Sequence, residues 1–335
     1  MSINMDRVYD FVQLKTESYL TKKKAKKLYE KQHKTLKSEI LDWLDAIVFA
    51  VVVVLVINLL FVQLYLIPSP SMETTLMTGD RVVVSKFIYG CEIFPEGPKI
   101  FSGRVPDRDD IITFYNPTYE SRGPVFSTIS TMLYMATFSL VNIDRDAEGN
   151  MLEKLLVKRV AGVGGDTVTF ENGYAKIKLS GTDEYVDEQQ FRSENGYAVS
   201  QQRSIEESTY TAYNALGQLN GMAEKNLSLS QVPSHLLNDY YSMDQNAYYT
   251  DNYSYELNIY EGMRKADPTD MSSRSNYVRM RLGIYVPEGS VLPLGDNRDN
   301  SNDGRYFGTV TESKVNGRVV FVFWPLSAIK SVLGK

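Results

Sequence analysis

Histidine and cysteine are scarce in this chain of 335 residues, which has two histidines, His33 and His235, and a single cysteine, Cys91. With so few of these ligands and no C-x-x-C pair, the sequence speaks against a zinc site. One cysteine cannot form an internal disulfide. Because unpaired cysteines are usually buried, we expect Cys91 to be a structural thiol rather than a catalytic group.

The chain also lacks an excess of positive charge. Its 36 Lys and Arg residues are outnumbered by 41 Asp and Glu residues, so the net charge is −5. Binding of nucleic acid requires a basic face, and we therefore expect no nucleic-acid partner. The length is sufficient for one large domain or two ordinary ones with a substantial core.

One long apolar segment, residues 46–67, contains no charged residue. As a helix it is long enough to cross a hydrocarbon layer of about 30 Å. Lysines are frequent in the segment before it, and lysines beside a membrane helix tend to remain in the cytoplasm. We therefore predict a cytoplasmic helical segment over residues 1–45 and a single-pass anchor over residues 46–67. We also expect membrane lipid as a partner and the cytoplasmic membrane as the location. The residues after the anchor should lie on the outer side of that membrane.

A cleaved export signal is the alternative interpretation of residues 46–67. Export signals have a shorter apolar core and end in a small-x-small cleavage site. Here the basic leader is long and the next residues are Pro68, Ser69 and Pro70. An uncleaved anchor fits this pattern better.

A second apolar patch, residues 125–141, is diluted by Ser and Thr. It could lie on the outer leaflet, which we favour, form a buried core element, or cross the membrane weakly. A single crossing would place residues 71 and 158 on opposite sides of the membrane. The chemistry considered below requires the two residues to meet.

After the anchor, short runs rich in β-branched residues predict strands. They cover residues 81–84, 110–114, 155–160, 168–170 and 318–323. Residues 171–282 are polar and lack a catalytic motif, and we expect an inserted subdomain of strands and loops there. This order predicts a mainly β catalytic domain over residues 68–170 and 283–335.

Ser71, just beyond the anchor, is a candidate nucleophile that needs a base to remove its proton. His33 lies on the wrong side of the predicted membrane, and His235 lies in the polar insert. Lysine can serve as the base if burial lowers its pKa from about 10.4. In a strand, the side chain of Lys158 would share the apolar face of Leu156. A loop serine and a surface lysine of an edge strand remain the alternatives.

The third segment with possible chemistry is residues 294–308, which are rich in Asp, Asn and Gly. That composition is typical of a tight turn. The spacing of Asp299, Ser301 and Asp303 also resembles a calcium loop, but the twelfth position is Val310 instead of Glu. We therefore expect no metal at this segment.

Together, the three segments resemble the signature boxes of the type I signal peptidases, in the same order and behind an anchor. The resembling stretches are IPSPSMETTLMTGDRVVVSKFIYG, VKRVAGVGGD and GDNRDNSNDGRYFG, followed by the closing strand GRVVFVFWP. The resemblance implies a serine endopeptidase with a mainly antiparallel β domain and an inserted subdomain. It implies removal of signal peptides from exported preproteins through an acyl-enzyme, without a cofactor.

The resemblance also implies roles for individual residues. Ser71 would be the nucleophile, Lys158 the general base and later the acid, and Ser69 a hydroxyl donor to the oxyanion. The support residues would be Ser301, holding the Lys158 amine, Asp303 with Arg305, and an ion pair between Asp296 and Arg159. Shallow pockets for small side chains would be lined by Ile67, Pro68, Met72, Leu76, Leu156 and Val157.

The chain departs from the usual family pattern at three positions. Thr74 stands where proline is usual, Pro70 where Gly or Ala is common, and Gly304 where Ser is frequent. None of them removes a reacting group. The alternatives that remain are a Ser–Lys peptidase with other substrates, such as a self-cleaving regulator, and a non-enzymatic surface-binding protein.

Overall fold

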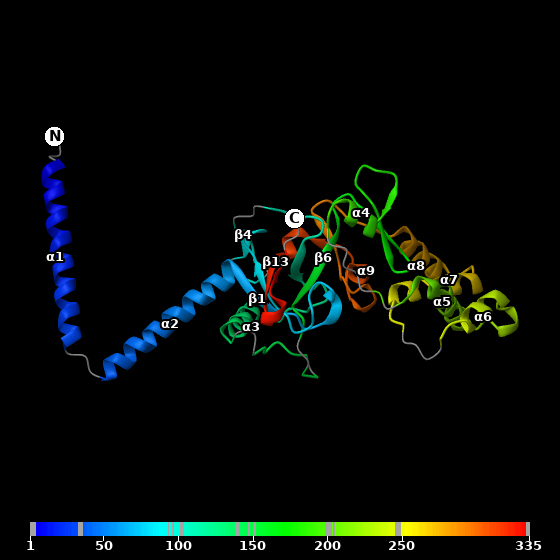
Figure 1. The fold of residues 1–335 in the computed structure, drawn as a ribbon, viewed down its shortest axis with the longest axis horizontal. Coiled ribbons are helices and arrows are strands. Elements are labelled where there is room, and N and C mark those ends of the chain that lie inside the picture. The colour runs from blue at the N-terminus through cyan, green and yellow to red at the C-terminus, as the bar shows by residue number, and fades with distance from the viewer. Residues whose placement is uncertain are drawn as a thin grey trace. The chain divides into compact units, whose positions relative to one another are not determined.

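The computed structural model describes residues 5–32, 36–92, 94–95, 97–100, 104–137, 141–146, 148–149, 152–197, 203, 205–244 and 249–332. The chain divides into two units, Met1–Val54 and Leu55–Lys335. The first unit contains helix α1, Met5–Gln32, and most of helix α2, Leu36–Leu60. Figure 1 shows both helices, with α2 leading into the second unit.

The bounds of the predicted anchor, residues 46–67, are wrong. Helix α2 begins ten residues earlier, at Leu36, and ends at Leu60. Strand β1, Val62–Leu66, follows and pairs along its whole length with strand β2, Arg81–Ser85. Hydropathy alone places residues 62–66 in the anchor helix. They form a strand instead because β2 supplies hydrogen-bond partners for their backbone. Within the residues that the structure describes, no helix combines the length and apolar character needed to cross a membrane.

A large antiparallel sheet forms the centre of the second unit. Its strand order is β1-β2-β13-β5-β6-β11-β12, and β14 pairs with β13. Beyond β1 and β2, its strands are β5 (Ile111–Tyr115), β6 (Leu155–Val163), β11 (Ser290–Leu294), β12 (Val310–Thr311), β13 (Val315–Trp324) and β14 (Lys330–Ser331). Every residue of β5 and β11 is buried, which is typical of strands covered on both faces. The prediction of a mainly antiparallel β domain is therefore confirmed.

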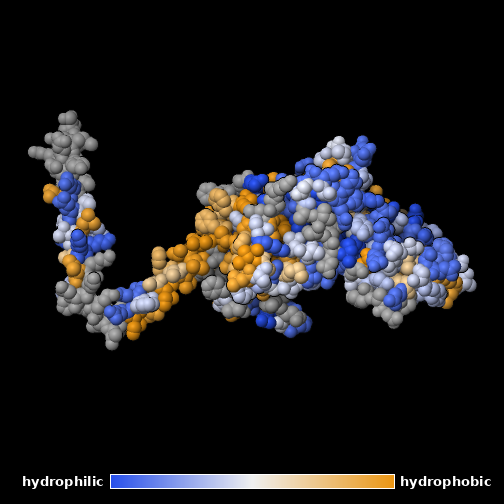
Figure 2. Space-filling view, viewed as in Figure 1, coloured by the Kyte–Doolittle hydropathy of each residue, from blue (hydrophilic) through white to orange (hydrophobic). Residues whose placement is uncertain are grey.

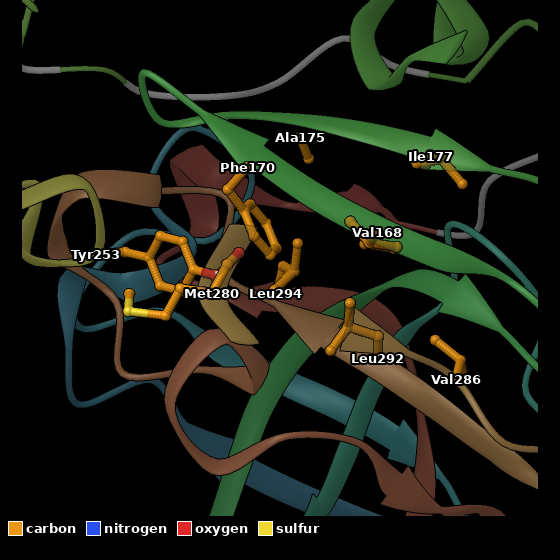
Figure 3. Close-up of a cluster of buried hydrophobic side chains, with 10 residues drawn as sticks. Val168, Phe170, Ala175, Ile177, Tyr253, Met280, Val286, Leu292 and Leu294 are labelled. Carbon is orange, nitrogen blue, oxygen red and sulfur yellow. The ribbon is translucent and has the colours of Figure 1, made fainter. Parts of the chain in front are cut away.

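A second antiparallel sheet has the order β10-β7-β8-β9. Its strands are β7 (Thr167–Glu171), β8 (Tyr174–Lys178), β9 (Tyr185–Asp187) and β10 (Ile284–Tyr285), and a small pair is formed by β3 (Cys91–Glu92) and β4 (Lys99–Ile100). Cys91 is buried, as expected for a structural thiol. Side chains of β7 and β8 pack against β11 and two helices of the insert, as Figure 3 shows for Val168, Leu292 and Tyr253. This shared core fixes the position of β11, and with it the position of the loop that follows β11.

The polar segment 171–282 is mainly helical, so the prediction of strands and loops there is wrong for most of its length. Its helices are α4 (Glu188–Glu194), α5 (Tyr210–Glu224), α6 (Ser234–Tyr241), α7 (Asn252–Ala266) and α8 (Met271–Leu282). Asp187, Asp251 and Asp270 cap three of them through hydrogen bonds from the first turn. Figure 1 shows α5 to α8 gathered beside the β-strands. Figure 2 shows that the visible surface of these helices is largely hydrophilic, in keeping with the polar sequence from which strands and loops were predicted.

Close packing of α5 on α7 depends on glycine. A Cβ on Gly221 would lie 2.0 Å from the carbonyl oxygen of Ile259, and one on Gly262 would lie 2.0 Å from that of Gln218. Only glycine allows two helix backbones to approach to this distance.

Helix α3, Pro124–Ala136, contains residues 125–136 of the second apolar patch, residues 125–141. Its polar Ser127 and Ser130 are buried, whereas Val125 and Ile129 are 72% and 55% exposed. The alternative of a buried apolar core element is therefore wrong, because the apolar face of the helix points outward. Short helices complete the unit: α9 (Gly304–Phe307), η1 (Pro70–Met72), η2 (Glu207–Thr209), η3 (Leu229–Gln231), η4 (Arg298–Asn300), η5 (Glu312–Lys314) and η6 (Leu326–Ala328).

Candidate active site

Ser71 lies at the middle position of the single-turn helix η1, which starts at Pro70. Pro70 suits this place because its fixed φ matches the first turn and its missing N–H needs no partner there. The carbonyl oxygen of Ser71 accepts a hydrogen bond of 3.1 Å from the backbone N–H of Asn297. The Asn297 side chain donates to the carbonyl oxygen of Pro70 over 3.2 Å. The loop after β11 therefore holds the backbone of η1, which we call the serine turn, through two hydrogen bonds.

Lys158 reaches Ser71 from the middle of β6. Its Nζ lies 2.8 Å from Ser71 Oγ and donates to the carbonyl oxygen of Val157 over 3.0 Å. Lys158 is 3% exposed and Ser71 is 8% exposed. Burial lowers the pKa of Lys158 to about 8, against the attraction of the Asp303 carboxylate. Such an amine is neutral in about a tenth of the molecules at pH 7 and in about half at pH 8.

Ser69 stands beside Ser71 at the start of the same turn. The two hydroxyl oxygens are 3.4 Å apart, close to the limit for a hydrogen bond. Two residues beyond η1, Thr74 has a φ of 84°. Proline, whose ring fixes φ near −65°, could not adopt this conformation, so the departure at Thr74 agrees with the local backbone.

Arg159, next to the lysine, points to the opposite side of β6. Its guanidinium donates to both carboxylate oxygens of Asp296, over 2.8 and 2.7 Å. The Thr75 hydroxyl donates to the same carboxylate over 2.5 Å. This buried group ties β6, the loop after β11 and the serine turn together, and supplies the desolvated carboxylate with the donors that it requires.

Asp303 and Arg305 form a second buried ion pair, with 2.9 Å between Asp303 Oδ1 and Arg305 Nε. Asp303 also accepts from the backbone N–H of Gly295 over 2.9 Å and caps helix α9. Burial by itself would raise the pKa of Asp303, but the Arg305 charge and these hydrogen bonds lower it overall. Asp303 therefore connects Gly295 with Arg305, the two ends of this loop segment.

Ser301 does not make the contact expected of it. Its hydroxyl is buried and has no hydrogen-bond partner among the described residues, so it does not hold the Lys158 amine. It lies instead against Gly295, where an added Cβ would be 2.2 Å from Ser301 Oγ and 2.6 Å from the carbonyl oxygen of Ser71. The loop can pass this close to the serine turn only because residue 295 is glycine.

A cleft of about 360 Å³ opens at Ser71 and Lys158. Five of the six residues expected to line substrate pockets do line it: Ile67, Pro68, Met72, Leu156 and Val157. Leu76 does not, because it is fully buried in the core cluster that contains Val82 and Val322. His235 is exposed on α6 and does not line the cleft either.

Several residues that hold the loop after β11 were not predicted from the sequence. Gly295 and Asn297 stand inside the third segment and could have been found from their place in it. The buried ion pair of Arg298 with Glu188 of α4, at 2.7 Å, could not, because the two residues are 110 positions apart. The same is true of Arg203, which pairs with Asp299 over 2.9 Å.

The pattern of the family described as signal peptidase, peptidase S26, matches residues 40–324 of this chain. The chain belongs to this family. This S26 peptidase is 26% identical over 295 residues to signal peptidase I of Haemophilus influenzae, a match that covers 86% of this chain and 71% of the relative. It is 24% identical over 305 residues to signal peptidase I of Aquifex aeolicus, covering 84% and 89%.

A crystal structure of a signal peptidase I from Enterococcus faecalis is matched over 65% of this S26 peptidase and 100% of its own chain. The identity is 19% and the TM-score is 0.25. Family membership makes the chain a hydrolase and supports removal of signal peptides as its activity.

Proposed function

We propose that this S26 peptidase cleaves signal peptides from exported preproteins with Ser71 as the nucleophile and Lys158 as the general base. The observation that carries the proposal is the 2.8 Å separation of Ser71 Oγ and Lys158 Nζ in a buried site. A serine hydroxyl is activated by a base within hydrogen-bond reach, and no histidine lines the described cleft to take that part.

The reaction is acyl transfer in two steps. The neutral Lys158 amine takes the proton of Ser71 while Ser71 Oγ attacks the scissile carbonyl carbon. The resulting ammonium gives that proton to the leaving amine, the C–N bond breaks, and an ester to Ser71 remains. Lys158 then takes a proton from water, whose oxygen attacks the ester, and returns it to Ser71 Oγ as the signal peptide leaves.

The oxyanion formed in each step needs hydrogen-bond donors. We assign this role to the backbone N–H of Ser71 and to the hydroxyl of Ser69, which lies beside the nucleophile. The side chains lining the cleft next to Ser71 include Ile67, Met72 and Leu156. These walls favour small, uncharged side chains at the first and third positions before the cut.

We further propose that α2 attaches the enzyme to the membrane, with the catalytic unit on the outer side. Side chains of the apolar part of α2 are exposed, including Ile47 at 54%, Val48 at 60% and Phe49 at 71%. Figure 2 shows this apolar surface along the helix. Such a surface is stable only when lipid or protein covers it. Replacement of Val51 and Val53 by lysine should release the chain from membranes washed with carbonate, and retention of the variant would contradict attachment through α2.

Cleavage of a preprotein tests the catalytic assignment. Ser71→Ala and Lys158→Met should each abolish processing, while Ser313→Ala and Lys314→Met, at exposed positions of the same unit, should retain it. Circular dichroism verifies that the four variants are folded. Full processing by either site variant would overturn the proposal.

A further inference from the structure

The cleft that opens at Ser71 has a second, polar end. Five successive strands of the large sheet, β1, β2, β13, β5 and β6, each contribute at least one polar residue there. The residues lie within the strand or directly beside its end: Gln63, Lys86, Asn316, Tyr115 and Lys154. They come from the same end of the sheet, because Tyr115 pairs with Leu155 and Gln63 pairs with Val84.

This end of the cleft is deeply buried. Gln63 is 2% exposed, Lys86 is 3% exposed and Asn316 is 1% exposed. Removing amide and ammonium groups from water is costly unless they are hydrogen-bonded. Side chains with this chemistry therefore require partners within the fold or in a bound molecule.

Each amide nitrogen donates one hydrogen bond within the fold, whereas the two amide oxygens accept none among the described residues. Gln63 Nε2 donates to the Tyr65 hydroxyl over 3.1 Å, and Asn316 Nδ2 to the Tyr115 hydroxyl over 3.4 Å. Among the described residues, Gln63 Oε1 and Asn316 Oδ1 are buried and have no hydrogen-bond partner. A natural fold rarely leaves such acceptors unpaired, so a bound donor is the simplest explanation for both.

Two ammonium groups also belong to this end of the cleft. Lys86 and Lys154 both line it, with Lys154 Nζ 5.7 Å from the centre of the Tyr115 ring. Buried Glu92, which accepts from the Tyr115 hydroxyl, is the carboxylate that attracts Lys86. The polar end therefore combines two acceptor oxygens that lack a donor among the described residues with two ammonium groups.

Only some side chains complement this combination. An aliphatic group leaves both oxygens unpaired, a carboxylate pairs with the ammonium groups but leaves both amide oxygens without a donor, and an ammonium meets two lysines. A carboxamide fits both halves, because its NH₂ can donate to the amide oxygens while its C=O accepts from an ammonium.

The spacing indicates which residue of the substrate reaches this end. Lys154 precedes Lys158 by four residues, which corresponds to about 13 Å in an extended chain. Leu156 and Val157, proposed to contact the residues before the cut, lie between the two lysines. An extended substrate along this wall brings its fifth residue before the cut beside Lys154.

We propose that the polar end of the cleft is a specificity subsite for an Asn or Gln side chain at the fourth or fifth position before the scissile bond. This inference rests on the proposed function, because the cut at Ser71 sets the count of positions.

A series of matched peptides tests the subsite. Peptides with Gln, Met or Glu at the fifth position, and a parallel set at the fourth, are compared by kcat/KM. At one of these positions Gln should exceed Met and Glu by at least about tenfold, because the wrong side chain leaves buried polar groups unpaired. In the Gln63→Met enzyme, the ratio of kcat/KM for the Gln peptide to kcat/KM for the Met peptide should fall below about threefold. The Gln190→Met enzyme, changed at an exposed position of α4, should retain the full ratio. Lys154→Met, at a half-buried position, is a second variant with the same expected loss if Gln63→Met does not fold.

Binding separates failure of the subsite from failure of the proposed function. The same peptides are titrated calorimetrically into Ser71→Ala, which reads the subsite without the reaction. Equal dissociation constants for the Gln and Met peptides at both positions would overturn the subsite, even if Ser71-dependent cleavage is intact. Preference for Gln in binding, together with cleavage that does not depend on Ser71, would support the subsite and overturn the proposed function.

Discussion

The Nζ of Lys158 lies 2.8 Å from the Oγ of Ser71, although the two residues are 87 positions apart in the chain. Ser71 belongs to a single turn of helix after β1, and Lys158 to the middle of β6. Their contact depends on the loop after β11, whose Asn297 donates to the backbone of the serine turn. The site is therefore assembled from three separate segments that the sheet brings to one place.

The pH dependence of activity should follow the Lys158 amine. Burial lowers the pKa of Lys158 to about 8, and only the neutral amine can accept the Ser71 proton. We expect kcat/KM to rise about tenfold per pH unit in the acidic range and to level off above about pH 8. Measurement of kcat/KM between pH 5 and 10 checks this, and a profile that is flat below pH 8 would contradict the role of the lysine.

The same amine should make stability depend on pH. Because the folded-state pKa lies below the ordinary value of 10.5, the unfolded chain binds more protons between about pH 8 and 10.5. Stability should therefore increase as the pH rises through this window. Buried Lys86, with its pKa lowered to about 8, adds an effect of the same sign. Chemical denaturation of Lys158→Met should show a smaller increase than the parent chain, and an equal increase would contradict the assignment.

Gly295→Ala should impair catalysis more than folding. The added Cβ would lie 2.6 Å from the carbonyl oxygen of Ser71, so the serine turn must move to admit it. A displacement near 1 Å at a nucleophile can cost about a hundredfold in rate, and we expect kcat/KM to fall at least about tenfold. Steady-state kinetics and a thermal melt check this together. Unchanged kinetics would show that the close approach of loop and turn has no catalytic consequence.

Asp303→Asn should destabilise the chain by about 3–5 kcal/mol, because it leaves the buried Arg305 guanidinium without its counter-charge. Asparagine has nearly the same shape, so the effect is one of charge rather than of packing. Urea denaturation at neutral pH measures it. Asp183→Asn, at an exposed position, should change stability little, and an equally small effect at residue 303 would contradict our account of the loop.

Gly221→Ala should destabilise the helical insert, against the usual direction of this substitution. Alanine in place of glycine normally stabilises a helix by about 0.5–1 kcal/mol. Here the added Cβ would lie 2.0 Å from the Ile259 carbonyl oxygen on α7, and relief of that clash should cost about 1–3 kcal/mol. Glu224→Ala, at an exposed position of α5, provides the control. Greater stability of Gly221→Ala would show that α5 and α7 are not in such close contact.

Local patterns in the sequence predicted β2, β5, β6 and β13 of the large sheet, because β-branched runs such as residues 155–160 and 318–323 favour strands by themselves. They failed at residues 62–66, where an apolar segment continues from α2 but pairs with β2. They also failed for the insert, since α5 and α7 pack through Gly221 and Gly262 rather than through large apolar side chains. In both places a partner distant in the sequence decides the local structure.

The sequence by itself determined which groups are available for chemistry. Only two histidines are present, one cysteine excludes an internal disulfide, and the resemblance of three segments to the signature boxes of the type I signal peptidases predicts a Ser–Lys peptidase. Only the tertiary structure decided that Lys158 is buried and that Ser301 lies against Gly295. It also decided that polar side chains from five strands meet at one end of the cleft. The physical reason is that burial and hydrogen bonding depend on neighbours that sheet pairing brings together, and residue order along the chain does not specify those neighbours.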